Sequence, residues 1–140
     1  LGIKSREIFW VKIGQNIGDE EYGKGDMFSR PIIVVKQLTG DLFLGIPLTS
    51  TLKNDDYFHS FEFSTKKGIV QNSAMILQLK AFSKKRITDK IGKIDTVEFK
   101  KIQDKLNDSL CEKIIKDTAT ATGWIHDTIK LICQKKGLNE

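Results

Sequence analysis

An arginine and a row of hydroxyl residues flank two neighbouring apolar segments of this sequence. Arg30 and Pro31 directly precede the strand-like run 32–35, and Thr49 closes the next run and begins three consecutive hydroxyl residues. If the two runs form adjacent strands, a guanidinium and a hydroxyl can meet at one point. Arginine pairs two phosphate oxygens through its planar fork and keeps its charge. The pattern is therefore compatible with a phosphate-binding site built from Arg30 and Thr49, and the alternatives are a surface arginine and a threonine that serves a turn.

The other side-chain patterns point away from metals and cofactors. His59 and His126 are the only histidines, and neither lies in a ligand-spaced cluster with Cys, Asp or Glu, so we expect no metal site. The sequence also lacks a Walker loop and a Rossmann glycine motif. Cleavage of RNA by its own 2′-hydroxyl needs no cofactor, only a base, a cation and a donor for the leaving oxygen. Arg30 suits the role of the cation, and the Thr49 hydroxyl can hold a nonbridging oxygen.

A basic cluster lies between positions 80 and 93, in a chain of net charge +5. A modest positive excess favours a polyanionic partner without proving one. The cluster either follows an RNA backbone or forms a solvated loop face, and both interpretations stay open. Tyr22, in a polar loop, is a candidate for stacking on unpaired bases, whereas Trp10 is more typical of a core. The cluster comprises Lys80, Lys84, Lys85, Arg86, Lys90 and Lys93.

The first part of the chain is typical of a small β-rich fold. Residues 14–29 are polar and glycine-rich and are interpreted as a long loop, and the turn 39–41 predicts a hairpin between its two flanking strands. Five or six short strands with tight turns favour a closed or half-closed barrel, because closure removes exposed sheet edges. The expected strands cover residues 7–13, 32–36, 42–48, 57–64, 73–79 and 91–94.

From Asp95 the hydrophobic period becomes that of a helix. Asp95 can cap its first turn, with Glu98 as the capping-box partner. A second, weaker amphipathic helix is predicted over 124–135. Cys111 and Cys133 are interpreted as half-buried thiols, since two cysteines do not make a disulfide framework. The apolar face of the first helix comprises Phe99, Ile102, Leu106, Leu110 and Ile114.

Several short motifs, in their order along residues 6 to 110, resemble the MazF/PemK family of toxin ribonucleases. Three features depart from the family pattern: a longer loop before Arg30, Leu77 at an often acidic position, and the extension 111–140. The segments that carry the resemblance are Gly18-Asp19-Glu20, Arg30-Pro31, Pro47-Leu48-Thr49-Ser50, Met75-Ile76-Leu77-Gln78-Leu79-Lys80, Lys84-Lys85-Arg86-Ile87 and the run 90–94.

The resemblance implies roles for particular side chains. Arg30 and Thr49 would be catalytic, with Glu20 as the base. His59 is an alternative base or acid, and the other interpretation of His59 is an exposed strand histidine. The expected RNA-binding residues come from the resemblance, the basic cluster and the polar loop. They are Gln78, Lys80, Ser50, Asp19, Tyr22, Lys84 and Lys85.

The resemblance also implies a fold, a function and partners. The fold would be a mainly β, α+β SH3-like barrel with C-terminal helices: a domain of residues 1–110, with 111–140 as a helical extension packed on it. The function would be that of a cytoplasmic type II toxin that cleaves single-stranded RNA without a cofactor. A homodimer and a MazE-like antitoxin would be its protein partners. The alternatives are a non-catalytic toxin or binding module on the same fold, such as a gyrase poison, and an inactive relative. With no apolar run near ~20 residues, we expect no membrane span.

Overall fold

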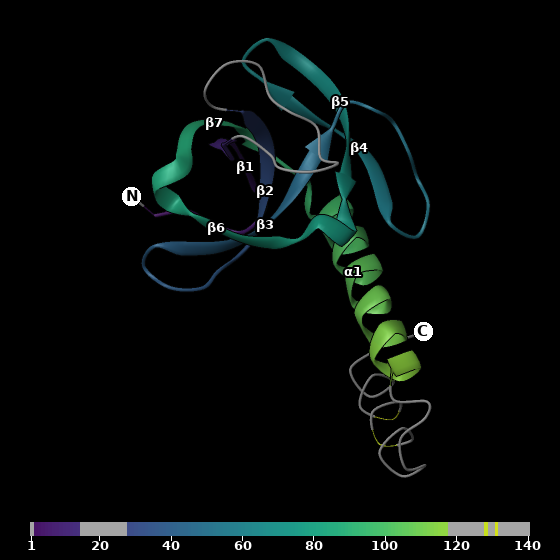
Figure 1. The fold of residues 1–140 in the computed structure, drawn as a ribbon. Coiled ribbons are helices and arrows are strands. Elements are labelled where there is room, and N and C mark those ends of the chain that lie inside the picture. Colours follow the sequence, from purple (N-terminus) through teal and green to yellow (C-terminus); the bar gives the residue numbers. More distant parts are fainter. Residues whose placement is uncertain (1, 15–27, 118–127, 129–130, 132–140) are drawn as a thin grey trace.

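The computed structural model describes residues 2–14, 28–117, 128 and 131, and its described part is one curled antiparallel sheet with a C-terminal helix (Figure 1). The strand order is β4-β5-β3-β2-β1-β7, and β6 pairs with the free part of β3. The predicted small barrel with a C-terminal helix is confirmed. The elements are β1 (Glu7–Lys12), β2 (Ser29–Gln37), β3 (Leu42–Thr49), β4 (Phe58–Thr65), β5 (Gly68–Met75), β6 (Lys80–Ser83), β7 (Ile87–Lys93) and α1 (Thr96–Asp117), with 3-10 turns η1 (Ile76–Gln78) and η2 (Lys84–Arg86).

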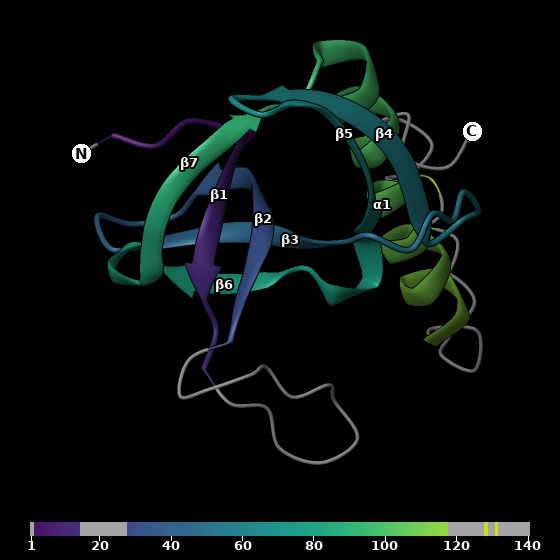
Figure 2. The same ribbon diagram turned by 90° about the horizontal axis from the view of Figure 1, so that it is seen from above.

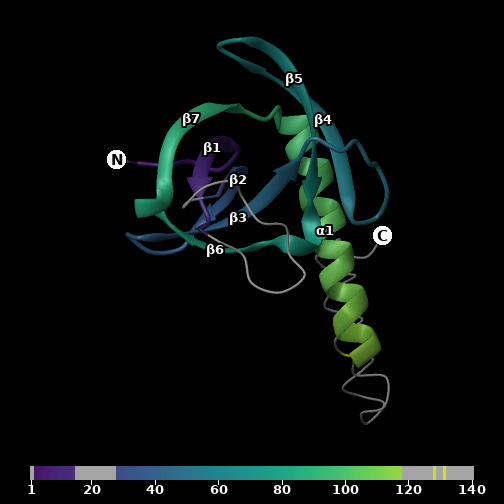
Figure 3. The same cartoon turned by 45° about the horizontal axis from the view of Figure 1, so that its top comes forward.

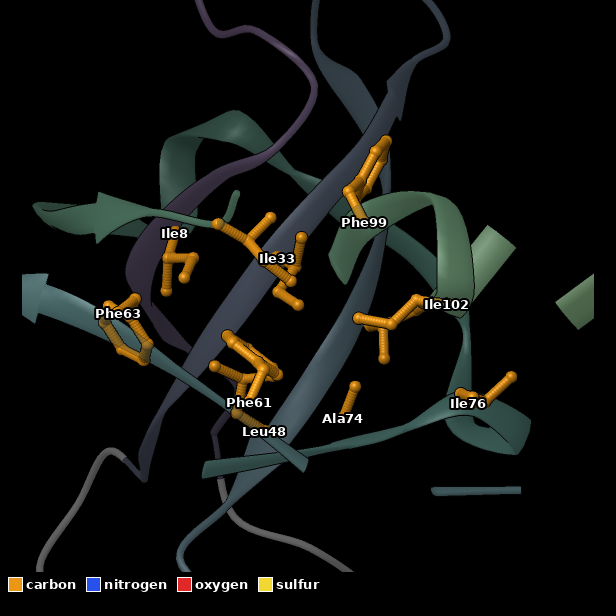
Figure 4. Packing of buried hydrophobic residues seen from close by; sticks show 11 residues of the cluster. Ile8, Ile33, Leu48, Phe61, Phe63, Ala74, Ile76, Phe99 and Ile102 are labelled. Carbon is orange, nitrogen blue, oxygen red and sulfur yellow. The ribbon is translucent and has the colours of Figure 1, made fainter. Parts of the chain in front are cut away.

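Both faces of the central strands are covered, which explains the continuous apolar run in β2. Ile33 faces a core beneath α1, and its neighbours Ile32 and Val34 face the interior of the barrel. We call these the helix-side core, part of which Figure 4 shows, and the barrel core. The helix-side core comprises Ile8, Ile33, Ile46, Leu48, Phe61, Phe63, Ala74, Ile76, Ile94, Phe99 and Ile102. The barrel core comprises Ile3, Phe9, Val11, Ile32, Val34, Phe43 and Phe82.

The second half of the sheet differs most from the sequence-based expectation. β5 begins at Gly68 rather than at residue 73, and Ile76–Gln78 form a 3-10 turn rather than strand. β6 was not predicted as a strand, and β7 is longer than expected. The first half of β5 is exposed and follows no alternation of apolar and polar residues, so it carries no strand signal. Trp10, interpreted as core, is 40% exposed.

Helix α1 lies beside β4 and β5 and extends past them (Figures 1 and 3). The predicted cap is confirmed, because Asp95 Oδ2 accepts a hydrogen bond from the Val97 amide at 3.1 Å. The Glu98 carboxylate instead binds His59. Phe99 is buried, whereas Leu110 is 48% exposed, since the helix has left the barrel by that turn. None of the helices within the described residues is long and apolar enough to cross a membrane.

The cysteine interpretation is wrong for Cys111. This residue is buried and disulfide-bonded, not a free thiol. The other cysteine, Cys133, and most of the predicted second helix lie outside the described residues. Helix α1 runs through the expected boundary at residues 110 and 111, and the packing of the extension 111–140 stays a prediction.

Strand β7 closes against β4, as Figure 2 shows from above, and Gly92 of β7 lies at this contact. A Cβ atom at this position would lie 2.7 Å from the backbone oxygen of Ser64 and 2.9 Å from the ring of Phe63. We therefore expect Gly92→Ala to lower the free energy of unfolding by about 1–3 kcal/mol, because backbone cannot yield as a side-chain tip can. Urea denaturation measures the change. Gly40→Ala is the matched control, since nothing lies within 4 Å of its Cβ position, and equal effects of the two changes would contradict the expectation.

Candidate functional site

Arg30 and Thr49 lie opposite each other at one end of the β2–β3 hairpin. Ile32 pairs with Pro47 in the antiparallel ladder. The same register sets Arg30, two residues before Ile32, against Thr49, two residues after Pro47. Directly opposed residues in an antiparallel pair project from the same face. The condition set by the sequence is therefore met: the two strands are neighbours, and the guanidinium and the hydroxyl leave the same side of the sheet.

The contacts of the Arg30 guanidinium at this strand end include a hydrogen bond and a ring contact. Its Nη1 donates to the Leu48 carbonyl oxygen at 3.1 Å, and its Cζ lies 5.1 Å from the centre of the Phe28 ring. Phe28 stands two residues before Arg30, and in extended backbone this spacing directs the two side chains to the same face of the sheet. Arg30 is half-buried, and the planar fork of a guanidinium matches the oxygens of a phosphate group.

The hydroxyl of Thr49 is fixed by the backbone that follows it. Its Oγ1 accepts a hydrogen bond from the Thr51 amide at 3.3 Å, a local turn typical of threonine. Among the described residues no hydrogen bond uses the hydroxyl hydrogen of Thr49, so this hydrogen can be donated to a ligand oxygen. Ser50, the next residue, is exposed.

Lys80 shares the sheet face of Arg30 and Thr49, whereas Gln78 lies on the turn before it. Lys80 pairs with Gly45, which stands four residues before Thr49 on β3 and so faces the same way. Its Nζ lies 5.1 Å from the centre of the Phe82 ring. Gln78 is exposed, and its Nε2 donates a hydrogen bond to Met75 Sδ at 3.6 Å.

The remaining residues expected to bind RNA are separated from this strand end or lie outside the described part of the chain. The Lys84 amide donates to the Asp41 carbonyl at the β2–β3 turn, the opposite end of β3 from Thr49, and Lys85 is exposed beside it. Arg86 instead donates from Nη1 to the Lys12 carbonyl at 3.3 Å, and Lys12 pairs with the residue before Arg30. Asp19, Glu20 and Tyr22 lie outside the described residues.

The side chain of His59 lies on the helix-side face of the sheet, the opposite face from that of Thr49, and has a structural role. It is 6% exposed and pairs with Ala74 of the helix-side core. Its Nδ1 lies 3.2 Å from Lys105 Nζ and its Nε2 lies 2.9 Å from Glu98 Oε2. An ammonium can only donate, so Nδ1 accepts and Nε2 carries the proton given to Glu98. His59 is thus neither an exposed strand residue nor a base for the Arg30–Thr49 site.

The contact with α1 makes stability depend on acid pH. The hydrogen bond from His59 holds the pKa of Glu98 below 4.5. A carboxylate whose pKa is lower in the folded than in the unfolded state stabilises the fold at pH values above its unfolded-state pKa. This stability is lost as the pH falls through the folded-state pKa. We expect Glu98→Gln to flatten the fall of the melting temperature between neutral pH and the region below 4.5, because Gln does not titrate. Glu62→Gln, on the exposed side of β4, is the control; an unchanged acid slope in Glu98→Gln would count against this role.

Two residues at the site were missed by the sequence analysis. Phe28 had a usable signal, since it stands two residues before Arg30 at the start of a strand. Asn72 had none: its Nδ2 donates to the Thr49 carbonyl at 3.2 Å, across 23 positions of sequence. That contact exists only because β5 pairs with the end of β3.

The assembled site offers a cation and a hydroxyl donor on one face of a sheet. Such a pair can bind a phosphate group and stabilise negative charge that develops on it. Within the described ranges no group of three or more His, Cys, Asp or Glu side chains is arranged to hold a metal ion.

Comparisons with known proteins agree with this fold. Residues 4–110 match the family model of the PemK-like, MazF-like toxin of type II toxin–antitoxin systems. A solved endoribonuclease in complex with its cognate antitoxin, from a Mycobacterial species, has a similar fold, with TM-score 0.60 and 13% identity over 78% of this chain and 95% of that one. MazF from Deinococcus radiodurans is also similar, with TM-score 0.58 and 18% identity over 77% and 96%. No curated protein matches the sequence.

Proposed function

Because this chain belongs to the family of PemK-like, MazF-like toxins of type II toxin–antitoxin systems, we propose that it is a metal-independent endoribonuclease that cuts single-stranded RNA at a short sequence. The observation that carries the proposal is the placement of Arg30 opposite Thr49, on one face of the sheet and at one end of adjacent strands. This pair suits a phosphoryl transfer in which the protein supplies position and charge.

The proposed reaction uses the 2′-hydroxyl of the substrate as the nucleophile. A base takes the 2′-proton and the 2′-oxygen bonds to phosphorus. The bond to the 5′-oxygen breaks as a general acid or water donates a proton to that oxygen, which leaves a 2′,3′-cyclic phosphate and a 5′-hydroxyl. Arg30 neutralises the extra charge of the phosphorane, and Thr49 donates its hydroxyl hydrogen to a nonbridging oxygen. We assign the base to Glu20 on the family pattern alone.

The RNA strand is proposed to cross the sheet face that carries the pair. Ser50 directly follows Thr49, and Lys80 of β6 pairs with Gly45, four residues before Thr49 on β3. We propose that these two residues bind the RNA and that Gln78 contacts it from η1. Lys84 and Lys85, beside the β2–β3 turn, bind phosphates further along the strand. The loop residues Asp19 and Tyr22 complete the binding surface, with Tyr22 stacking on a base. Each phosphate contact steepens the fall of affinity with salt.

We further propose a homodimer that acts in the cytoplasm and is blocked by a small antitoxin. The similar endoribonuclease from a Mycobacterial species was solved in complex with its cognate antitoxin, which supports such a partner for this chain. An antitoxin that occupies the RNA surface would compete with the substrate.

Incubation of the purified, antitoxin-free protein with a long unstructured RNA in EDTA tests the proposal. We expect discrete cuts whose new ends are 2′,3′-cyclic phosphate and 5′-hydroxyl, and mapping these ends gives the recognition sequence. Cuts that require added metal, or that leave a 5′-phosphate, would contradict the mechanism.

One observation favours a second candidate, a toxin that binds a target without cutting RNA. Leu77 stands where the family often has an acidic residue, and its side chain is 65% exposed beside Gln78. A leucine side chain can neither accept nor donate a proton, so this position supplies no acid–base group. A folded protein that leaves every RNA intact would favour this candidate, and the next measurement would be binding to gyrase and to ribosomes.

A further inference from the structure

The segment that follows Thr49 is held in place by β5. Residues 50–53 are exposed and lie between strands, so few packing contacts of their own order them. Two consecutive residues of β5, Asn72 and Ser73, hydrogen-bond to the two ends of the segment Thr49–Lys53. We call this segment the hydroxyl loop.

Ser73 holds the far end of the hydroxyl loop. Its fully buried side chain accepts a hydrogen bond from the Lys53 amide at 2.9 Å and donates one to the Lys53 carbonyl at 3.2 Å. One hydroxyl thus satisfies both backbone groups of Lys53. The Ser73 side chain takes the place of the backbone partners that Lys53 would have if β3 continued this far. Ser73 also pairs with Thr49 in the ladder between β3 and β5. Both ends of the hydroxyl loop therefore lie at Ser73.

Asn72 holds the near end, next to the proposed chemistry. Its Nδ2 donates to the Thr49 carbonyl at 3.2 Å, and the side chain is half-buried. The Thr49 carbonyl belongs to the peptide that joins Thr49 to Ser50. Fixing that peptide fixes the direction in which the chain turns towards the Thr51 amide, which in turn orients the Thr49 hydroxyl.

We propose that Asn72 is a positioning residue: it orients the Thr49 hydroxyl towards the phosphate without itself contacting RNA. This inference rests on the proposed function of Thr49. Orientation errors of about 1 Å cost about 10²-fold in rate. Loss of the Asn72 hydrogen bond therefore lowers the rate of the chemical step while leaving the RNA-binding surface intact.

Asn72→Asp tests the proposal, because the two side chains have the same shape and Asp cannot donate to the Thr49 carbonyl. Asn72→Ala removes the donor without adding charge. We expect both variants to lower kcat by about 10–100-fold with KM changed by less than about threefold. Gln71→Glu is the matched control, since it makes the same amide-to-acid change at the neighbouring exposed position of β5; it should keep the wild-type kcat.

Amide hydrogen exchange gives a readout that does not depend on activity. Faster exchange at the Thr51 and Lys53 amides in Asn72→Asp, with the melting temperature and the rest of β5 unchanged, is the expected result. Unchanged exchange in the hydroxyl loop, or a kcat loss that Gln71→Glu shares, overturns the positioning role. If the wild-type protein cuts no RNA, the proposed function fails, and the exchange experiment still decides whether Asn72 orders the hydroxyl loop.

Discussion

Replacing Arg30 with alanine should lower the rate of RNA cleavage by at least about 10³-fold, because the variant loses the charge that neutralises the phosphorane. The fold should survive, since Arg30 is only half-buried and contacts such as its hydrogen bond to the Leu48 carbonyl and its ring contact with Phe28 contribute modestly. Single-turnover rates on a short RNA that contains the mapped cleavage site measure the effect.

A second variant and a control separate geometry from charge. Arg30→Lys keeps the charge but loses the fork that reaches the Leu48 carbonyl and a phosphate together, so it should retain only a small part of the wild-type rate. Lys36→Ala removes a positive charge from the other end of β2, where the residue is exposed, and should cut RNA normally. Wild-type cleavage by Arg30→Ala would refute the assignment of this site.

Thr49→Val should lower the cleavage rate by about 10²-fold at nearly unchanged stability, because valine keeps the shape of threonine and removes the hydroxyl that holds a nonbridging oxygen. The loss should appear in kcat more than in KM, since the bond strengthens as charge develops on the phosphate. Thr49→Ser, which keeps the hydroxyl, should restore most of the rate.

Thr51→Val is the matched control for this change. Thr51 is exposed and contributes its backbone amide, not its side chain, to the contact with Thr49. We expect Thr51→Val to cleave at the wild-type rate. Equal losses in the two valine variants would mean that the hydroxyl loop, rather than the Thr49 hydroxyl, is what the reaction needs.

Local patterns were sufficient for the barrel strands near the N-terminus and for the start of the helix. The turn 39–41 joins two strands that pair as expected, and Asp95 caps α1. These features depend on residues within a few positions of one another, where turn chemistry and capping act. The same local patterns placed Arg30 and Thr49 on neighbouring strands.

Long-range pairing decided what local patterns could not. His59 is buried because α1 folds back onto β4 and brings Glu98 and Lys105 to its two ring nitrogens. Asn72 reaches the Thr49 carbonyl only through the pairing of β5 with β3. No sequence window of helical or strand length contains both partners of these contacts, so no periodicity could reveal them.

The register of the site itself was decided by the tertiary structure. At the turn, Gln37 pairs with Phe43, and this register continued without interruption would set Arg30 against Ser50. A bulge between Val34 and Lys36 shifts the pairing by one residue and sets Arg30 against Thr49 instead.

The bulge is stabilised by a segment about thirty residues earlier in the chain. The Arg6 amide donates to the Val34 carbonyl and the Ser5 hydroxyl donates to the Val35 carbonyl, each at 2.8 Å. A bulge leaves backbone groups without ladder partners, and buried groups of this kind must be satisfied from elsewhere. The residue types of the site can therefore be predicted from two short sequence motifs. The alignment of Arg30 with Thr49 depends on hydrogen bonds from the N-terminal segment, which only the folded chain brings into reach.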